Sequence, residues 1–411
     1  MAGRRRVVVL APHPDDEALG AAGFIHQAVR QGYDVHVVLM TSGDGFVQDA
    51  ERYYLSLTVS PEEYVHLGYE RQIEALRAMA ALGVPAENVT FLGFPDGGLD
   101  YLFLHYDAAR PFASPTTGCT SVPYIESPAY RTPYAGADLL NILSQVLADI
   151  QPDWVVTPLL LDQHPDHWAT SAFGSLALMA CRARQLPWAQ HAVHLGYLVH
   201  WNGWPLPLAY RPEMRSEAPA ALISYPGIQW EEFGYDPAAV EAKRASLLCY
   251  DSQVELIKPF LLAFARKTEV FGRQVAMPVE WEANWPQPRA ESLSRLLRRE
   301  SGILASHWRH GESTDQVRIT VKLDGLWSAR AVVYSFGRTV EFSGWNAGGQ
   351  GETDPGLTLS HREDGLELEW PSTRNESRRE WLKGVVFYRN NKMVGRTGFW
   401  PWVSSTDQGR V

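Results

Sequence analysis

The chain has 411 residues, which is more than a single hydrophobic core usually organises, so we expect two domains. Hydrophobic residues make up 45% of it and charged residues 20%, and no apolar run approaches the roughly 20 residues that cross a bilayer, so we expect a globular protein without a membrane span. The net charge of -10, without a sustained basic run, argues against a nucleic-acid partner.

The N-terminus and the cysteines both indicate a cytoplasmic protein. The apolar stretch after MAGRRR is short and continues directly into APHPDDE, whereas a signal peptide needs a longer apolar region and a small-residue cleavage site. The three cysteines are scattered and never form a CxxC pair, which indicates reduced thiols rather than disulfides or a thiolate metal site. The sequence leaves the oligomeric state open.

The first half of the chain alternates strand and helix patterns. Strands are predicted over residues 6–10, 34–40, 88–92, 154–157 and 194–201, and helices over 17–31, 69–82, 139–150 and 167–183. A further helical stretch is predicted over 241–271. Strands that alternate with helices are typical of an α/β fold, so we expect a Rossmann-like, doubly wound, mostly parallel sheet.

Two long segments interrupt this alternation, and a different pattern follows it. Residues 44–64 and 101–137 are rich in aromatic residues, and loops of such length are usually lids or binding loops. From residue 316 onwards the chain shows short alternating strands, typical of a small all-β, sandwich-like domain. We therefore predict an α/β domain over 1–279 with these two insertions, then a linker and β domain of unknown role over 280–411.

Two HPD segments carry the candidate chemistry. The first predicted strand ends in His13, Asp15 and Asp16, and the fourth is followed by Asp162, His164, Asp166 and His167. In an open α/β sheet, ligands bind at the carboxyl ends of the strands, near the point where the strand order reverses. If the chain restarts beside the first strand at the fourth, both segments meet in one crevice.

Two imidazoles and one carboxylate, with one coordination position left open, form the ligand set of a catalytic zinc site. Such a site also needs a carboxylate that takes a proton from water and a donor for the developing oxyanion. A lone HPD is an ordinary turn with a helix cap, but two of them at strand ends in one α/β chain favour a metal site.

HPDDE after a first strand and HPDH after a later one resemble the PIG-L/LmbE-like family of zinc-dependent N-acetylglucosaminyl deacetylases. The resemblance covers about residues 5–272 and implies hydrolysis of an N-acetyl or other N-acyl amide on an amino sugar. It implies zinc, or another divalent metal, and a small-molecule or oligosaccharide substrate. The long insertions and the β domain lie outside the compact family core.

The resemblance also implies roles for single residues. His13, Asp16 and His167 would bind the metal, Asp15 would be the general base, and His164 would stabilise the oxyanion or protonate the leaving amine. Asp166 would support the histidines from outside the ligand set. Arg71 and Asp96 would bind the substrate, but Arg71 also fits a surface helix charge and Asp96 also fits turn chemistry before two glycines.

The sequence contains further histidines and allows other functions to be compared with a deacetylase. His191, His194 and His200 lie in or near the fifth predicted strand, where such residues are more often core or surface histidines than site residues. A dinucleotide-binding oxidoreductase is disfavoured because carboxylates stand where GxGxxG would bind a pyrophosphate. The main alternative to a deacetylase is a non-catalytic carbohydrate-binding protein on the same fold.

Overall fold

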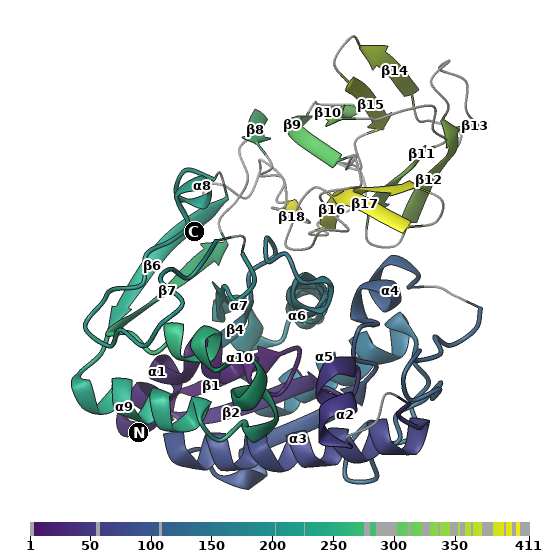
Figure 1. Ribbon diagram of the computed structural model, residues 1–411. Helices are drawn as coiled ribbons and strands as arrows, with labels where there is room; N and C mark the ends of the chain where they lie inside the picture. Colours follow the sequence, from purple (N-terminus) through teal and green to yellow (C-terminus); the bar gives the residue numbers. More distant parts are fainter. Residues whose placement is uncertain are drawn as a thin grey trace. The chain divides into compact units, whose positions relative to one another are not determined.

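The computed structural model describes residues 4–54, 58–106, 109–201, 203–225 and 227–274, and beyond them the backbone of several strands between residues 280 and 402. The chain divides into two compact units (Figure 1). The first consists of residues 1–219 and 229–274, and the second of residues 220–228 and 275–411.

The first unit contains a seven-stranded sheet with the strand order β3-β2-β1-β4-β5-β7-β6. Its strands are β1 (Arg6–Ala11), β2 (Asp34–Thr41), β3 (Val89–Phe94), β4 (Trp154–Pro158), β5 (Val193–Tyr197), β6 (Ile228–Gly234) and β7 (Thr268–Gln274). Pairs β1–β2, β2–β3, β1–β4 and β4–β5 are parallel, whereas β7 is antiparallel to β5. The prediction of a mostly parallel, doubly wound sheet is confirmed.

Helices cover both faces of this sheet because its central strands are apolar on both sides. Val7, Val9 and α1 belong to one core cluster, while Leu10 approaches Gly174 of α6 on the other face. The helices of this unit are α1 (Asp16–Arg30), α2 (Val47–Tyr53), α3 (Pro61–Leu82), α4 (Leu99–Leu104), α5 (Gly136–Ile150), α6 (Pro165–Ala183), α7 (Pro187–His191), α9 (Pro237–Leu247), α10 (Asp251–Ala263) and the short 3-10 helix Ala86–Asn88. Helix α8 (Ala220–Ile223) belongs to the second unit. Among the described helices, none has the length and apolar composition that crossing a membrane requires.

Several element boundaries differ from the predictions. Helix α3 begins eight residues before the predicted start. Ser60 is its N-cap, Pro61 is its first residue, and Ser60 and Glu63 together form a capping box. Strand β5 ends at Tyr197, which leaves His200 in the loop beyond it. The prediction of one helical stretch over 241–271 is wrong: α9 and α10 are separate helices, and residues 268–274 form β7. Strand β7 is buried along most of its length, so it lacks the alternation that marks a half-exposed strand.

The second unit is described mainly by the backbone of its strands. These are β8 (Glu280–Asn284), β9 (Gly302–His310), β10 (Thr314–Lys322), β11 (Ala329–Ser335), β12 (Arg338–Trp345), β13 (Glu352–Thr353), β14 (Thr358–Arg362), β15 (Gly365–Pro371), β16 (Trp381–Arg389), β17 (Lys392–Arg396) and β18 (Trp400–Trp402). They pair antiparallel in two sheets. Much of the predicted linker lies outside the described residues, so the domain boundary and the sandwich stay predictions.

Candidate active site

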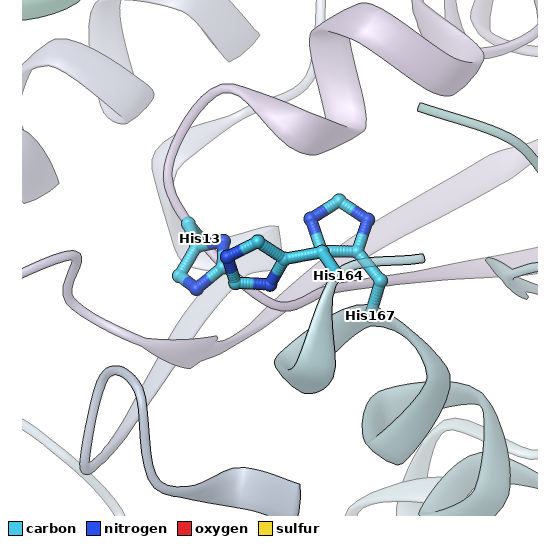
Figure 2. A group of neighbouring side chains, drawn as sticks. All are labelled: His13, His164 and His167. Atoms are coloured by element: carbon cyan, nitrogen blue, oxygen red, sulfur yellow. The ribbon is translucent and has the colours of Figure 1, made fainter. Parts of the chain in front are cut away.

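The two HPD segments meet at the carboxyl ends of β1 and β4, which are hydrogen-bonded neighbours. His13 lies in the turn between β1 and α1, whereas His164 and His167 lie at the N-terminus of α6 (Figure 2). The ring centroid of His13 is 5.0 Å from that of His164 and 5.6 Å from that of His167. The predicted convergence of the two segments is therefore confirmed.

Asp16 joins the two histidines that were predicted as metal ligands. Its Oδ2 atom lies 3.0 Å from Nδ1 of His13 and 3.2 Å from Nε2 of His167. Two ligand atoms at about 2.1 Å from one tetrahedral zinc ion would be about 3.4 Å apart, so both separations are close to those of a shared ion. Asp16 is the first residue of α1, where a carboxylate also interacts favourably with the helix dipole.

The second nitrogen of each imidazole lies beside a further carboxylate. Nε2 of His13 is 3.0 Å from Oδ2 of Asp166 and 3.1 Å from Oδ1 of Asp96. Nδ1 of His167 is 3.3 Å from Oδ2 of Asp162. Metal-binding histidines almost always have one nitrogen on the metal and the other on a carboxylate, carbonyl or water. Each ring has one nitrogen beside Asp16, where the metal would bind, and its other nitrogen beside a further carboxylate.

The residues present fit a divalent cation. Both ring nitrogens of His167 are buried and, among the described residues, have no partner with hydrogen-bond geometry, as expected of atoms suited to binding a metal ion. Within the described part of the chain, three groups place ligand atoms within 4.8 Å of one another: His13 with His164 and His167, Asp16 with His167 and His200, and His13 with Asp96 and Asp166. Imidazole and carboxylate donors suit zinc but do not exclude other divalent metals.

The charges around these ligands also favour a cation. Burial alone lowers the pKa of His167, but Asp16 and Asp162 overcome this effect and raise the pKa to about 10. The pKa of Asp16 falls well below its usual value although burial opposes this, chiefly because of His167. Asp16 is therefore ionised at neutral pH, and a cation would take the place of protons on the rings.

His164 has a different environment from the other two histidines. It is the N-cap of α6, and its Nδ1 atom accepts a hydrogen bond of 3.2 Å from the backbone N–H of Asp166. Burial, together with His167 and His13, lowers the pKa of His164 to about 4. The ring is thus neutral, and because Nδ1 accepts, its proton is on Nε2. A neutral Nε2–H group is suited to donate to an oxyanion.

Asp166 ties α6 to the turn after β3. Its carboxylate accepts hydrogen bonds from the backbone N–H groups of Gly97, at 2.7 Å, and Leu99, at 2.9 Å. Asp96 lies in the same turn, and its Oδ2 atom accepts from the N–H of Gly45 at 2.8 Å. The structure thus places Asp96 against His13 and the loop after β2, and its predicted role as a substrate contact stays a prediction.

Asp15 and Arg71 are both buried at the edge of this cluster. Burial, assisted by Asp16, raises the pKa of Asp15 well above its usual value, although Arg71 opposes the shift. The guanidinium of Arg71 donates to the backbone carbonyls of Gly43 and Pro14 and lies 3.6 Å from Asp15 Oδ2. Arg71 is therefore not the exposed surface charge that was weighed against a substrate contact.

The structure adds two residues to which sequence reasoning had given no role. Asp162 is fully buried, and its Oδ2 atom accepts from the backbone N–H groups of Val199 and His200, each at 3.0 Å. The ring of His200 lies 4.6 Å from that of His167 and stacks on Phe260. The place of Asp162 beside HPDH was a usable signal, whereas nothing in the sequence around His200 separated it from a core histidine.

The comparisons with known proteins agree with this geometry. Residues 8–178 match the family model described as PIG-L: GlcNAc-PI de-N-acetylase. This part of the chain is similar to the PIG-L family. It contains all eight residues that were predicted to form the site.

The chain also has curated relatives. Over 195 residues the chain is 31% identical to a 1D-myo-inositol 2-acetamido-2-deoxy-alpha-D-glucopyranoside deacetylase of Tsukamurella paurometabola, a match that covers 46% of this chain and 60% of that protein. The chain thus spans less than two thirds of the length of this relative.

Solved structures resemble the chain only distantly. The A40926 pseudoaglycone deacetylase Dbv21 is 19% identical with a TM-score of 0.41, over 66% of this chain and 98% of that one. GalB, the 4-carboxy-2-hydroxymuconate hydratase of Pseudomonas putida KT2440, is 14% identical with a TM-score of 0.40, over 67% and 97%. Likeness at this level does not separate a deacetylase from a hydratase, and the case for function has to come from the site.

Proposed function

We propose that the protein hydrolyses the N-acetyl or other N-acyl amide of an amino sugar, releasing acetate or the corresponding acid and a free amine. His13, Asp16 and His167 would hold the divalent ion, for which zinc is the first candidate. The observation that carries the proposal is the shared contact of both imidazoles with Asp16 Oδ2, each ring having a second carboxylate on its other nitrogen.

The remaining residues have environments that suit hydrolysis. When bound, the ion would supply Lewis acidity to the amide carbonyl and to water. Asp15 is the N-cap residue of α1, but its side chain makes no capping hydrogen bond. Its raised pKa suits a group that accepts a proton from water. The neutral His164 would donate its Nε2–H group in a hydrogen bond to the oxyanion. To protonate the leaving amine instead, the ring would first have to take up a proton, because only the imidazolium form can give one up.

The substrate class comes from the curated relative, whose printed name specifies an acetamido sugar joined to inositol. We propose an N-acetylated amino sugar, free or in an oligosaccharide, as the substrate. Asp96 is the better placed candidate for a sugar contact, because its side chain keeps 11% of its surface exposed while that of Arg71 keeps 4%.

The alternative, a carbohydrate-binding protein without catalysis, would need the same fold but not a proton acceptor beside the metal site. Asp15 and His164 are both present, and each has an environment that fits a catalytic role. We therefore favour the enzyme, and the same experiment separates the two functions.

The test is acetate release by the full-length, zinc-loaded protein from a panel of N-acetylated monosaccharides, glycosides and oligosaccharides. Asp15→Asn should lower kcat by roughly 10²- to 10⁴-fold, because a positioned general base contributes about that much. Asp149 is exposed, and its carboxylate accepts a hydrogen bond from the side chain of Gln145. Asp149→Asn should therefore leave kcat within about twofold of the wild-type value. Sugar binding without acetate release from any substrate would favour the non-catalytic alternative.

A further inference from the structure

The turn that carries Asp15 has a backbone conformation that costs energy. Asp15 has φ 127° and ψ -31°, in a region that favours glycine because a side chain at Cβ is crowded there. Residues are held in such conformations only where their surroundings impose them, and such sites often have a functional reason.

The peptide unit before Asp15 is held at both of its polar ends. Its carbonyl oxygen, that of Pro14, accepts a hydrogen bond of 2.7 Å from Nη2 of Arg71. Its N–H group, that of Asp15, donates to Oε2 of Glu17 at 3.3 Å. The orientation of this peptide plane determines φ at Asp15, so Arg71 and Glu17 together fix the strained angle.

Both side chains that hold this peptide are themselves fixed. Arg71 is 3% exposed, and its Nη1 atom donates to the carbonyl of Gly43 at 2.9 Å. Gly43 leaves the room that Arg71 occupies, since a Cβ there would lie 2.2 Å from Nη1. Glu17 is fully buried and accepts a hydrogen bond from the hydroxyl of Tyr250.

We propose that Arg71 is a positioning residue, which together with Glu17 clamps the Pro14–Asp15 peptide and so aims the Asp15 carboxylate. This differs from the substrate contact that the family resemblance implies for Arg71. The guanidinium has its Nη atoms directed at two backbone carbonyls from different loops, and little of its surface remains for a sugar. A bidentate arrangement of this kind needs the planar fork of arginine and is not available to lysine.

The kinetic test rests on the proposed function and compares Arg71→Lys with Arg77→Lys, an exposed position on the same helix. For Arg71→Lys we expect kcat to fall by about 10- to 100-fold, since misplacing a catalytic group by about 1 Å costs that much, with KM within about twofold. Gly43→Ala displaces the Arg71 guanidinium and should likewise lower kcat with little change in KM. A rise in KM with unchanged kcat would assign Arg71 to the substrate instead.

A second test needs no catalytic activity, so it remains decisive if no substrate is found. Asp15→Asn removes the charge but keeps Cβ and the strain, whereas Asp15→Gly removes both. If Arg71 holds the strained angle, its loss also releases strain wherever residue 15 has a Cβ, so Arg71→Lys should lower the melting temperature less in the Asp15→Asn background than in the Asp15→Gly background. Equal losses in the two backgrounds would show that Arg71 does not hold the strained peptide, and would overturn the proposal.

Discussion

At the scale of single residues, the site depends on carboxylates that act on histidines. Asp16 contacts one nitrogen of His13 and of His167, and Asp166 and Asp162 contact the other nitrogens. Although burial by itself raises the pKa of Asp162, the adjacent His167 lowers it to about 2, so the carboxylate is ionised beside the ring. Backbone hydrogen bonds from His164, Val199 and His200 hold this carboxylate in place beside the His167 ring.

This geometry predicts a loss of metal affinity without loss of a ligand. Asp162→Asn keeps the size of the side chain but removes the charge that faces Nδ1 of His167. We expect the zinc dissociation constant to rise about 10- to 100-fold, as is typical when the carboxylate behind a metal-binding histidine is changed. Competition with a chromophoric chelator measures the constant, and Asp149→Asn is the matched control. An unchanged affinity would mean that Asp162 serves the fold alone.

At the scale of elements, the described part of the long insertion is tied to the sheet. Tyr124 donates a hydrogen bond of 2.6 Å to Asp44, in the loop after β2, and its ring packs edge-on against Tyr69 of α3. Gly93 of β3 makes room for it, since a Cβ there would lie 2.6 Å from the ring. Tyr124 and Tyr134 are each 1% exposed, so these aromatic residues pack inside the unit. That either insertion, 44–64 or 101–137, acts as a lid or binding loop stays a prediction.

Asp44 makes stability depend on pH. Burial, and secondarily Asp96, raises the pKa of Asp44 from 3.8 to about 7. Between these values the folded protein binds a proton that the unfolded chain has lost, so this contribution to stability is present below about pH 4 and is lost as the pH rises through 7. Asp44→Asn removes this titration. The free energy of unfolding of the mutant, relative to that of the wild type, should therefore increase with rising pH, by at most about 4 kcal/mol.

Denaturant unfolding of the wild type and of Asp44→Asn at pH 4, 5.5, 7 and 8 measures this difference. Asp153→Asn is a suitable control, because its carboxylate lies at the surface and accepts a hydrogen bond from the backbone N–H of Arg6. A difference between Asp44→Asn and wild type that does not change across this range would contradict the raised pKa.

At the scale of the whole molecule, every residue assigned to the site belongs to the first of the two compact units. The ion would connect the turn after β1 to the N-terminus of α6, two segments about 150 residues apart in the chain that only the folded unit brings together. Metal binding should therefore stabilise this unit and leave the other unchanged.

Calorimetry of the full chain with and without a chelator tests this expectation. At free zinc a thousandfold above the dissociation constant, the gain is about 4 kcal/mol, which raises the melting temperature of one transition by roughly 10 °C. The second transition should not move. A single transition, or two that shift together, would contradict independent units with the ion in only one.

The local sequence determined most of the elements of the first unit. Runs such as RVVVL, apolar on both faces, and helices closed by Gly32 and Gly83 have local signals that do not depend on distant contacts. The second half of the unit was harder to predict, because β7 has the sequence TEVFGRQ, in which polar residues are buried, so it shows neither the continuous apolar run nor the alternation that marks a strand. Its identity as a strand comes from pairing with β5, about 75 residues earlier in the chain.

The sequence alone also determined which residue types could bind a metal, because imidazoles and carboxylates in two HPD segments are visible in the printed chain. Tertiary structure decided which groups lie around them. Strand order and loop path decide which residues come close to one another. They bring Asp162 and His200 next to His167, and they place Arg71 where it donates a hydrogen bond to the carbonyl of Pro14. The chemistry of a side chain is local, but its neighbours are set by the fold, and the neighbours decide its role.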